Sequence, residues 1–165
     1  MSIRPFTADD LAACVDLYIR VYAQPPWHED WPYAAALAHF EQSTGTPGFY
    51  GWVAVEDGEL MGVLTGYTKP ALSGSVFFME DLFVAVARQR QGLATKLMTA
   101  VKKWVERQHS LGIALLTMRH APALAYYRQQ DFTQHHELAY LMWLPPEKPA
   151  KQQAAKPRKA GARGQ

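Results

Sequence analysis

Two acidic residues interrupt an apolar stretch near the middle of the chain. Residues 77–84 are otherwise aromatic or aliphatic, a composition typical of a central strand, but they include Glu80 and Asp81. A carboxylate in a buried strand is costly unless it has a partner or a chemical task. Apolar surroundings favour proton uptake by a carboxylate, so Glu80, with Phe78 and Leu82 expected on its own face, is a candidate base. Strand alternation places Asp81 on the opposite face, and we interpret it as structural.

A glycine-bearing turn follows this strand and opens a helix. Apolar residues recur every four positions from Leu93 to Val105, the spacing of an amphipathic helix. The unpaired N–H groups of a helix N-terminus bind phosphate, and small residues at Gly92 and Ala94 would let a ligand approach the backbone. Taken alone, the same pattern also fits close helix packing. The turn therefore predicts a phosphate site only in combination with other motifs.

Two adjacent tyrosines, Tyr126 and Tyr127, lie in a later helical segment. A phenol with a pKa near 10 can donate a proton to a thiolate whose conjugate acid has a pKa near 8.5. Taken alone, both tyrosines also fit packing in the core or at its rim.

The loop over residues 25–32 is rich in prolines, aromatic residues and acids. Carboxylates and aromatic ring faces both attract ammonium groups, so Trp27, Glu29, Asp30 and Trp31 are candidates for binding a cationic substrate. The alternative is a proline-stiffened connection whose tryptophans cover the core.

The remaining pattern alternates strands and helices. Strands are expected over residues 2–6, 49–56, 59–68, 76–84, 113–118, 132–136 and 137–144, and helices over about 11–22, 33–42, 92–109 and 121–130. Asp57-Gly58 closes a hairpin, and residues 69–75 form a loop. The strand–helix–strand crossover at residues 76–118 predicts an α/β sheet with helices on both faces.

Composition predicts one globular domain with a separate tail. The chain has 165 residues, one cysteine, no run of 18 apolar residues and no N-terminal signal segment, so we expect a cytoplasmic protein without a membrane span. Residues 146–165 carry six Lys or Arg residues and one acid. They are interpreted as a basic disordered tail after a domain at 1–145, and as a solubilising end rather than a nucleic-acid contact.

The order of the motifs resembles that of a known superfamily. Glu-Asp-Leu-Phe-Val, a short loop and then Gln-x-x-Gly-x-Ala opening a helix resemble the acetyl-CoA motif of the GNAT superfamily of N-acetyltransferases. Gln89, Gly92 and Ala94 meet this motif, and the strand half is most similar to the diamine and polyamine N-acetyltransferase branch. The resemblance covers roughly residues 1–145.

A second signature of the superfamily reads Asn-x-x-Ala-x-x-Phe-Tyr-x-x-x-Gly-Phe. The chain meets it at Ala123, Tyr127 and Phe132 and departs from it at three positions, His120, Tyr126 and Asp131. His120 replaces an asparagine that contacts the cofactor, and its imidazole can still donate a hydrogen bond.

The resemblance implies a mixed sheet splayed between its fourth and fifth strands, with the pantetheine arm of acetyl-CoA in the gap. It implies Glu80 as the base and Tyr127 as the acid. The cofactor-binding residues it implies are Leu82, Phe83, Val84, Gln89, Arg90, Gln91, Gly92, Leu93, Ala94, Thr95, His120 and Ala123, with Arg88 adding positive charge.

The function expected from this resemblance is acetyl-CoA-dependent transfer of an acetyl group to a primary amine, most simply a small cationic one. Two alternatives remain open at this point: an acyl-CoA-binding module with little turnover, and acetylation of a protein N-terminus or lysine. We expect no metal, and a monomer or homodimer.

Overall fold

The computed structural model describes residues 1–145. Contacts divide the chain into two compact units, Met1–Thr133 and a second that begins at Gln134. The first unit holds every helix and strand found in the described residues. No helix among them is long and apolar enough to span a bilayer.

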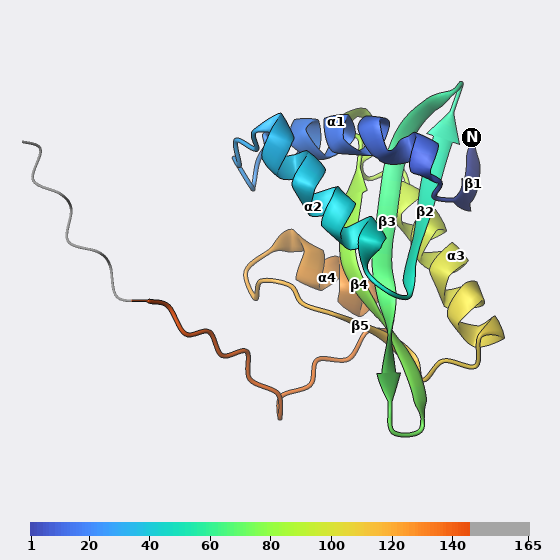
Figure 1. Ribbon diagram of the computed structural model, residues 1–165, viewed down its shortest axis with the longest axis vertical. Helices are drawn as coiled ribbons and strands as arrows, with labels where there is room; N and C mark the ends of the chain where they lie inside the picture. The colour runs from blue at the N-terminus through green and yellow to red at the C-terminus, as the bar shows by residue number, and fades with distance from the viewer. Residues whose placement is uncertain (146–165) are drawn as a thin grey trace, which may run out of the picture. The chain divides into compact units, whose positions relative to one another are not determined.

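The first unit is built on a five-stranded mixed sheet in the order β1-β2-β3-β4-β5 (Figure 1). The first four strands are antiparallel, and β5 runs parallel to β4. The strands are β1 (Ser2–Pro5), β2 (Phe49–Glu56), β3 (Glu59–Ala71), β4 (Gly74–Val84) and β5 (Gly112–Leu115).

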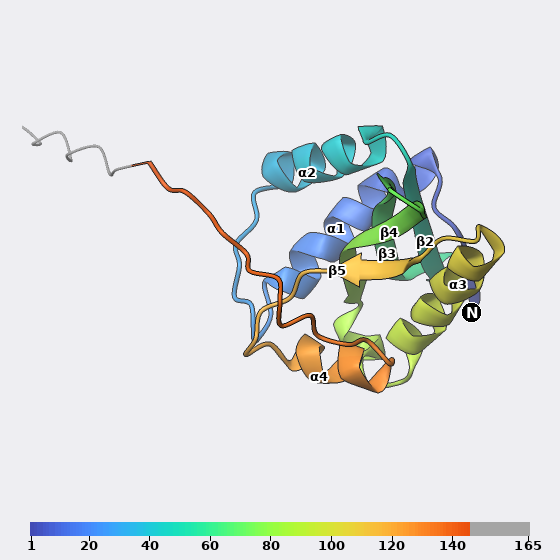
Figure 2. The ribbon, with the colours of Figure 1, turned by 90° about the horizontal axis from the view of Figure 1, so that it is seen from below.

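Helices cover both faces of this sheet, as predicted (Figure 2). One buried cluster joins the sheet to α1 (Leu11–Tyr22) and α2 (Tyr33–Gly45). The other joins it to α3 (Leu93–Arg107), with the tyrosines of α4 (Pro122–Gln129) packed against it. The mixed α/β architecture expected from the sequence is therefore confirmed.

The hairpin between β2 and β3 turns at Asp57 and Gly58, whose φ angles of 51° and 83° suit this sharp reversal. The expected loop over residues 69–75 was wrong, because β3 runs to Ala71 and β4 begins at Gly74. Strand β5 ends at Leu115, three residues earlier than expected.

Strand β4 carries one extra residue at its centre. Thr65 of β3 pairs with Asp81 and Gly66 pairs with Met79, so Glu80 has no partner in β3. Such a bulge resets the alternation of side chains along the strand. Met79 lies in the cluster on the α3 side, whereas beyond the bulge Phe83 lies in the cluster on the α1 and α2 side.

Pairing between β4 and β5 ends early. The last paired residues are Met79 and Leu115, although β4 continues to Val84. The backbone edge of β4 that faces β5 therefore has no strand partner after Met79. This is the divergence expected between the fourth and fifth strands.

The closing strands expected over residues 132–136 and 137–144 are absent from the described residues, so that prediction was wrong. Six large side chains between Leu138 and Leu144 are exposed. A run of apolar residues is compatible with a buried strand, but it does not supply the neighbouring strand to which the backbone must bond. The basic tail lies outside the described residues, and the expected domain limit at 145 stays a prediction.

Gly66 tests the packing opposite the bulge. A Cβ atom there would lie 2.7 Å from Cζ of Phe77 and 2.9 Å from Cα of Met79, and closer still to the carbonyl oxygen of Phe78. We expect Gly66→Ala to lower the free energy of unfolding by about 1–3 kcal/mol, measured by urea denaturation.

Gly45 at the end of α2 is the matched control, because a Cβ there meets nothing within 4 Å. Gly45→Ala should be neutral or slightly stabilising. Equal losses in the two variants would contradict the crowding at Gly66.

Candidate active site

A cavity of about 290 Å³ opens where β4, the start of α3 and α4 meet. It lies beside the part of β4 that has no β5 partner, and Leu82, Phe83 and Val84 line it. Its other lining residues are Val21, Tyr22, Trp27, Gln89, Ala94, Pro122, Ala123, Tyr126 and Tyr127. Seven of the sequence-predicted site residues thus share one cavity with Tyr127.

The glycine turn caps α3 next to this cavity. Gly92 adopts a left-handed conformation with φ 77° at the N-cap, and the N–H of Lys96 makes the first helical bond, to the Gly92 carbonyl, at 3.0 Å. The N–H groups of residues 93–95 precede that bond, and they and the helix dipole favour an anion at this end. Leu93 is buried, so it can offer only its backbone.

Arg88 does not simply add charge to this turn. Its Nε donates to Oε2 of Glu56 at 2.6 Å, and its guanidinium forms an ion pair with the same carboxylate. The expected contribution of Arg88 to anion binding is therefore offset by Glu56. Arg90 and Gln91, which follow Gln89 in the turn, are exposed.

Tyr127 projects from α4 against two other rings. Its centroid lies 5.5 Å from that of Tyr126 and 5.7 Å from that of Phe132. Burial, supported by the neighbouring Tyr126 and by the negative charge of Asp81, raises the pKa of Tyr127 to about 12. The hydroxyl group therefore stays protonated, and a potential donor, throughout the neutral pH range.

Glu80 lies in surroundings different from those predicted. It is exposed, and Oγ of Ser43 on α2 donates to its Oε2 at 2.7 Å. Leu82, expected on the same face, packs instead with the cluster on the α3 side. The bulge causes this difference, because Glu80 is the residue left out of the β3 pairing. Glu80 is not among the residues that line the cavity.

Asp81 lies on the same side as Glu80, so its predicted placement on the opposite face was wrong. It is 6% exposed, and its Oδ2 lies 3.0 Å from Nε2 of His39 on α2 and accepts a 3.3 Å hydrogen bond from Oγ1 of Thr65. The hydrogen bond to Asp81 raises the pKa of His39, while burial opposes the rise. Both acids of β4 thus contact polar side chains of α2.

Sequence reasoning missed His39 and Ser43. They lie four residues apart on α2, on the same side as the buried Phe40 and Ala36. Polar residues on the buried face of a helix require partners, and the two acids of β4 needed partners too. The need of both groups for polar partners is the signal in the sequence that could have predicted the contact between α2 and β4.

The predicted tryptophans of the loop over residues 25–32 pack against two tyrosines of α1 that were not predicted as site residues. Nε1 of Trp31 donates to Oε2 of Glu29 at 2.6 Å, and the Trp31 ring meets the edge of Tyr18 at 5.3 Å. Trp27 lies 5.7 Å from Tyr22, and both line the cavity. Tyr18 and Tyr22, which lie in the helix expected over residues 11–22 and were not predicted as site residues, therefore pack with the tryptophans of this loop.

Three of the predicted site residues lie outside the lining of the cavity. Asp30, Thr95 and His120 are exposed and do not line the cavity. His120 lies in the turn before α4, three residues from Ala123, which does line it. Their assignments stay predictions.

A model of the acetyltransferase (GNAT) family matches residues 12–132. The chain belongs to this family. The N-acetyltransferase class expected from the sequence is confirmed by this membership, whereas the polyamine branch is not. A search of curated proteins found no match.

Solved GNAT-like structures share the fold. An aminoglycoside acetyltransferase from an uncultured soil sample, in complex with sisomicin, is 20% identical with a TM-score of 0.70, over 87% of this chain and 95% of that one. A putative acetyltransferase from Agrobacterium tumefaciens is 24% identical with a TM-score of 0.70, over 87% and 100%. A ribosomal-protein-alanine N-acetyltransferase from Brucella melitensis is 16% identical with a TM-score of 0.70, over 87% and 100%.

The pair of His39 and Asp81 makes stability depend on pH. Because the pKa of His39 is raised in the folded state, the imidazolium stabilises the fold below the unfolded pKa of about 6.5, and this contribution is lost as pH rises through the folded value. We expect the stability advantage of the parent protein over His39→Gln to be largest near pH 6 and to shrink toward pH 8.5. Urea denaturation at each pH measures it.

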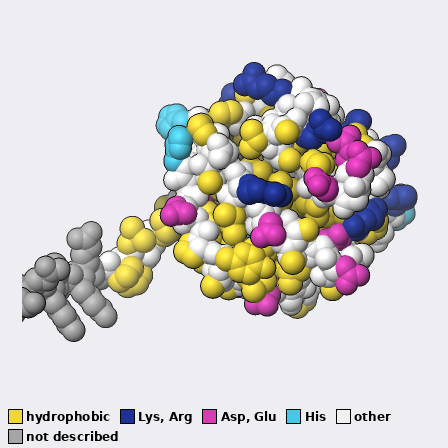
Figure 3. Space-filling model, turned by 90° about the horizontal axis from the view of Figure 1, so that it is seen from above, with side chains coloured by type: hydrophobic (Ala, Val, Ile, Leu, Met, Phe, Trp, Pro, Cys, Tyr) yellow, Lys and Arg dark blue, Asp and Glu magenta, His cyan; other side chains and the backbone are white. Residues whose placement is uncertain are grey.

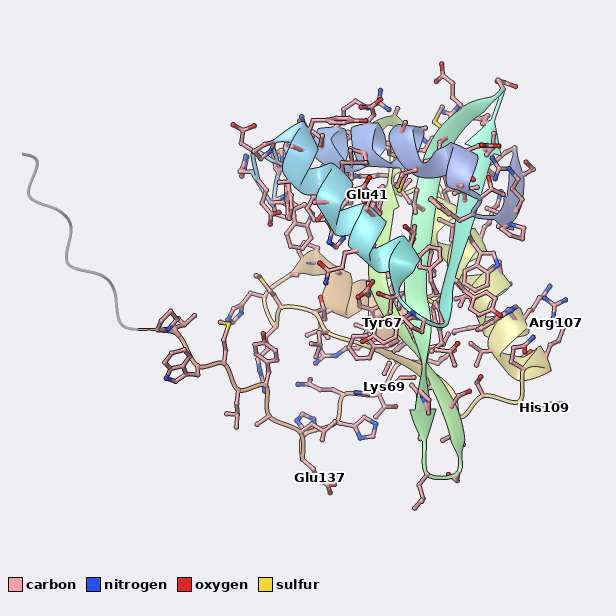
Figure 4. The ribbon with its side chains drawn as sticks, in the orientation of Figure 1. Glu41, Tyr67, Lys69, Arg107, His109 and Glu137 are labelled. Atoms are coloured by element: carbon pink, nitrogen blue, oxygen red, sulfur yellow. The ribbon has the colours of Figure 1, made fainter. Side chains whose placement is uncertain are left out.

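The control is His109→Gln, because His109 is exposed beyond α3, away from α2 (Figure 4). This variant removes an imidazole outside the contact between α2 and β4, so it measures the background effect of replacing a histidine with glutamine. A His39→Gln difference that is flat from pH 6 to 8.5 would contradict the raised pKa.

Proposed function

We propose that this GNAT protein transfers the acetyl group of acetyl-CoA to a primary amine of a small cationic molecule. The observation that carries the proposal is the convergence, at one cavity, of the unpaired end of β4, the Gly92 turn and Tyr127. Acetyl-CoA needs a backbone edge for its pantetheine arm and an anion site for its pyrophosphate, and these two features supply them.

The residues present fit this donor. The free edge of β4 at Leu82–Val84 offers backbone donors and acceptors, and the N–H groups that begin α3 offer an anion site. The thioester supplies an activated acetyl group. The protein must orient it, remove a proton from the amine and protonate or hydrogen-bond the departing sulfur.

Glu80 is our candidate for receiving the proton of the amine. A lysine-like amine has a pKa about 6 units above that of a glutamate, so direct transfer would be uphill by roughly 8 kcal/mol. The exposed position of Glu80, held by the Ser43 hydroxyl, suits a relay through water instead. One proton thus leaves the ammonium before the nitrogen attacks the thioester carbon.

Tyr127 is our candidate for the acid at the departing sulfur. With a pKa of about 12, its full ionisation in favour of a thiolate would be uphill by about 5 kcal/mol. Its hydroxyl therefore acts most effectively as a hydrogen-bond donor while the C–S bond breaks. The nitrogen loses its second proton as the amide forms, so one proton goes to sulfur and one to solvent.

The acceptor end of the site is the aromatic loop. Trp27 lines the cavity, and in the same loop Glu29 accepts a hydrogen bond from Trp31, so the loop combines ring faces with a negative charge. Both features favour a cation. The aminoglycoside acetyltransferase among the structural neighbours is compatible with such an acceptor, and an assay of thiol release with diamines, aminoglycosides and peptide N-termini would identify the preferred amine.

Gly92→Ala tests the donor site. At acetyl-CoA concentrations about 100-fold above Kd, the parent protein should gain roughly 2.7 kcal/mol of stability and a higher Tm. A methyl group at Gly92 meets no protein atom within 4 Å, so it would obstruct only a ligand at the turn. We expect most of the acetyl-CoA shift in Tm to disappear.

Gly58→Ala provides the control, because Gly58 also has a positive φ, 83° against 77°, and also has open space around its Cβ position. Both variants bear a similar backbone strain of roughly 1–2 kcal/mol. An acetyl-CoA shift that survives in Gly92→Ala as it does in Gly58→Ala would show that the donor binds elsewhere.

Tyr127→Phe and Glu80→Gln should fail in different ways. Tyr127→Phe should lower kcat by about 10²-fold or more with little change in acetyl-CoA affinity, because only the hydroxyl is lost. Glu80→Gln should recover as pH rises from about 6.5 to 9.5, since more of the amine is then already neutral. The measurement is kcat/KM across this range.

Glu41→Gln makes the same chemical change on an exposed residue of α2 and should match the parent protein (Figure 4). If Tyr127→Phe turned over like the parent protein, Tyr127 would not be the acid. A deficit in Glu80→Gln that does not vary with pH would place Glu80 in substrate binding.

A further inference from the structure

Helix α4, which carries Tyr127, depends on other elements for its position. It spans only eight residues, Pro122–Gln129, and none of them is fully buried. Among the described residues, no side chain caps its N-terminus. An isolated helix of this length is not stable in water, so contacts with its neighbours must hold it in place. The position of the Tyr127 ring at the cavity therefore depends on those contacts.

Lys102 of α3 supplies one of these contacts, at the C-terminal end of α4. Its ammonium group donates a 2.6 Å hydrogen bond to the carbonyl oxygen of Gln130, the residue that caps this end of the helix. The last carbonyl groups of a helix lack partners within the helix, and the helix dipole favours a cation there. A charge-assisted hydrogen bond from an ammonium group meets both conditions.

The turn that Lys102 contacts is bonded to Tyr127 itself. The carbonyl oxygen of Tyr127 accepts hydrogen bonds from the N–H groups of Gln130, at 2.9 Å, and Phe132, at 3.1 Å. The ring of Phe132 also packs against that of Tyr127, with centroids 5.7 Å apart. The Lys102 ammonium lies 5.8 Å from the centroid of Phe132. Lys102 therefore contacts two residues, Gln130 and Phe132, that each contact Tyr127.

Asp131, the remaining neighbour of Lys102 in this turn, contributes less than its charge suggests. It has a left-handed backbone, with φ 64°, and its Oδ2 lies 3.9 Å from the Lys102 ammonium. Its side chain is 97% exposed, and an ion pair in such surroundings is weak. The hydrogen bond to Gln130 is thus the main polar contact of Lys102 with the turn.

We propose that Lys102 is a positioning residue for Tyr127, because it fixes the C-terminal turn of α4 to α3 and so keeps the Tyr127 ring at the cavity. Lys102 does not line the cavity itself, so it acts on the reaction through Tyr127. The inference rests on the proposed function in taking Tyr127 to be the acid.

The same contact connects the acid to the donor site. Helix α3 begins at the Gly92 turn, where we place the pyrophosphate of acetyl-CoA, and Lys102 lies about 15 Å further along its axis. A donor bound at the start of α3 is thus presented to a tyrosine whose own helix is attached to α3. Such attachment matters for the rate, because misplacing a reacting group by about 1 Å can cost about 10²-fold.

The test is Lys102→Met, which keeps a long apolar side chain beside Phe132 but removes the ammonium group. With the amine that the thiol-release assay identifies, we expect kcat to fall about 10-fold, because Tyr127 is held less precisely. The Kd of acetyl-CoA, measured by isothermal titration calorimetry, should stay at the parent value, because the Gly92 turn is untouched. Lys103→Met makes the same change on the next residue of α3, which is exposed, and should match the parent protein.

A double-mutant cycle separates positioning from general damage to the fold. If Lys102 acts through the hydroxyl group of Tyr127, Lys102→Met should cause no further loss of kcat in a Tyr127→Phe protein. A residue that merely supports the fold would lower kcat by the same factor in both backgrounds.

Amide hydrogen exchange gives a readout that needs no turnover. The N–H groups of Gln130 and Phe132 should exchange about 10-fold faster or more in Lys102→Met than in the parent protein, because the turn opens more easily without its anchor. In Lys103→Met the same two groups should exchange at the parent rate.

The proposal is overturned if Lys102→Met keeps the kcat of the parent, if it loses the same factor in the Tyr127→Phe background, or if the two amides exchange at the parent rate. An impaired Tyr127→Phe beside a parent-like Lys102→Met would overturn this inference alone. Parent-like turnover by Tyr127→Phe would overturn the acid of the proposed function, and this inference with it.

Discussion

The bulge in β4 determines where the charges of this protein lie. If the same residues paired with β3 without a bulge, Asp81 would continue the alternation of Phe77 and Met79 and point into the apolar cluster on the α3 side. An unpaired carboxylate there would be strongly destabilising. The bulge turns it toward α2 instead, where His39 and Ser43 meet the two acids. Gly66 makes this possible, because it leaves room for the crowded β4 backbone.

The same bulge brings a negative charge toward the proposed acid. Asp81 is one of the causes of the raised pKa of Tyr127, after burial and Tyr126. A nearby negative charge disfavours the ionised phenol, so Asp81 helps to keep the Tyr127 hydroxyl group protonated and able to donate a hydrogen bond.

Local sequence patterns predicted the elements well where one segment determined its own structure. The periodicity of residues 11–22 gave α1, Asp57-Gly58 gave the hairpin, and Gly92 gave the start of α3. Contacts and strand pairings between residues far apart in the sequence could not be predicted from such local patterns. His39 and Asp81 are 42 positions apart, and a bulge leaves no mark on the apolar pattern of β4. The prediction of the closing strands failed for a related reason, since residues 137–144 form an apolar run that does not specify a partner strand.

The candidate site lies near residues whose types or conformations are unusual for their positions in the fold. Two acids occupy a central strand, a histidine and a serine occupy the inner side of α2, and Arg90 holds a positive φ of 58° just before Gly92. The face shown in Figure 3 mixes acidic, basic and apolar side chains without one continuous patch of either charge. The polar exceptions on α2 and β4 compensate one another, because His39 contacts Asp81 and Ser43 contacts Glu80, so each acid has a partner that the other element supplies.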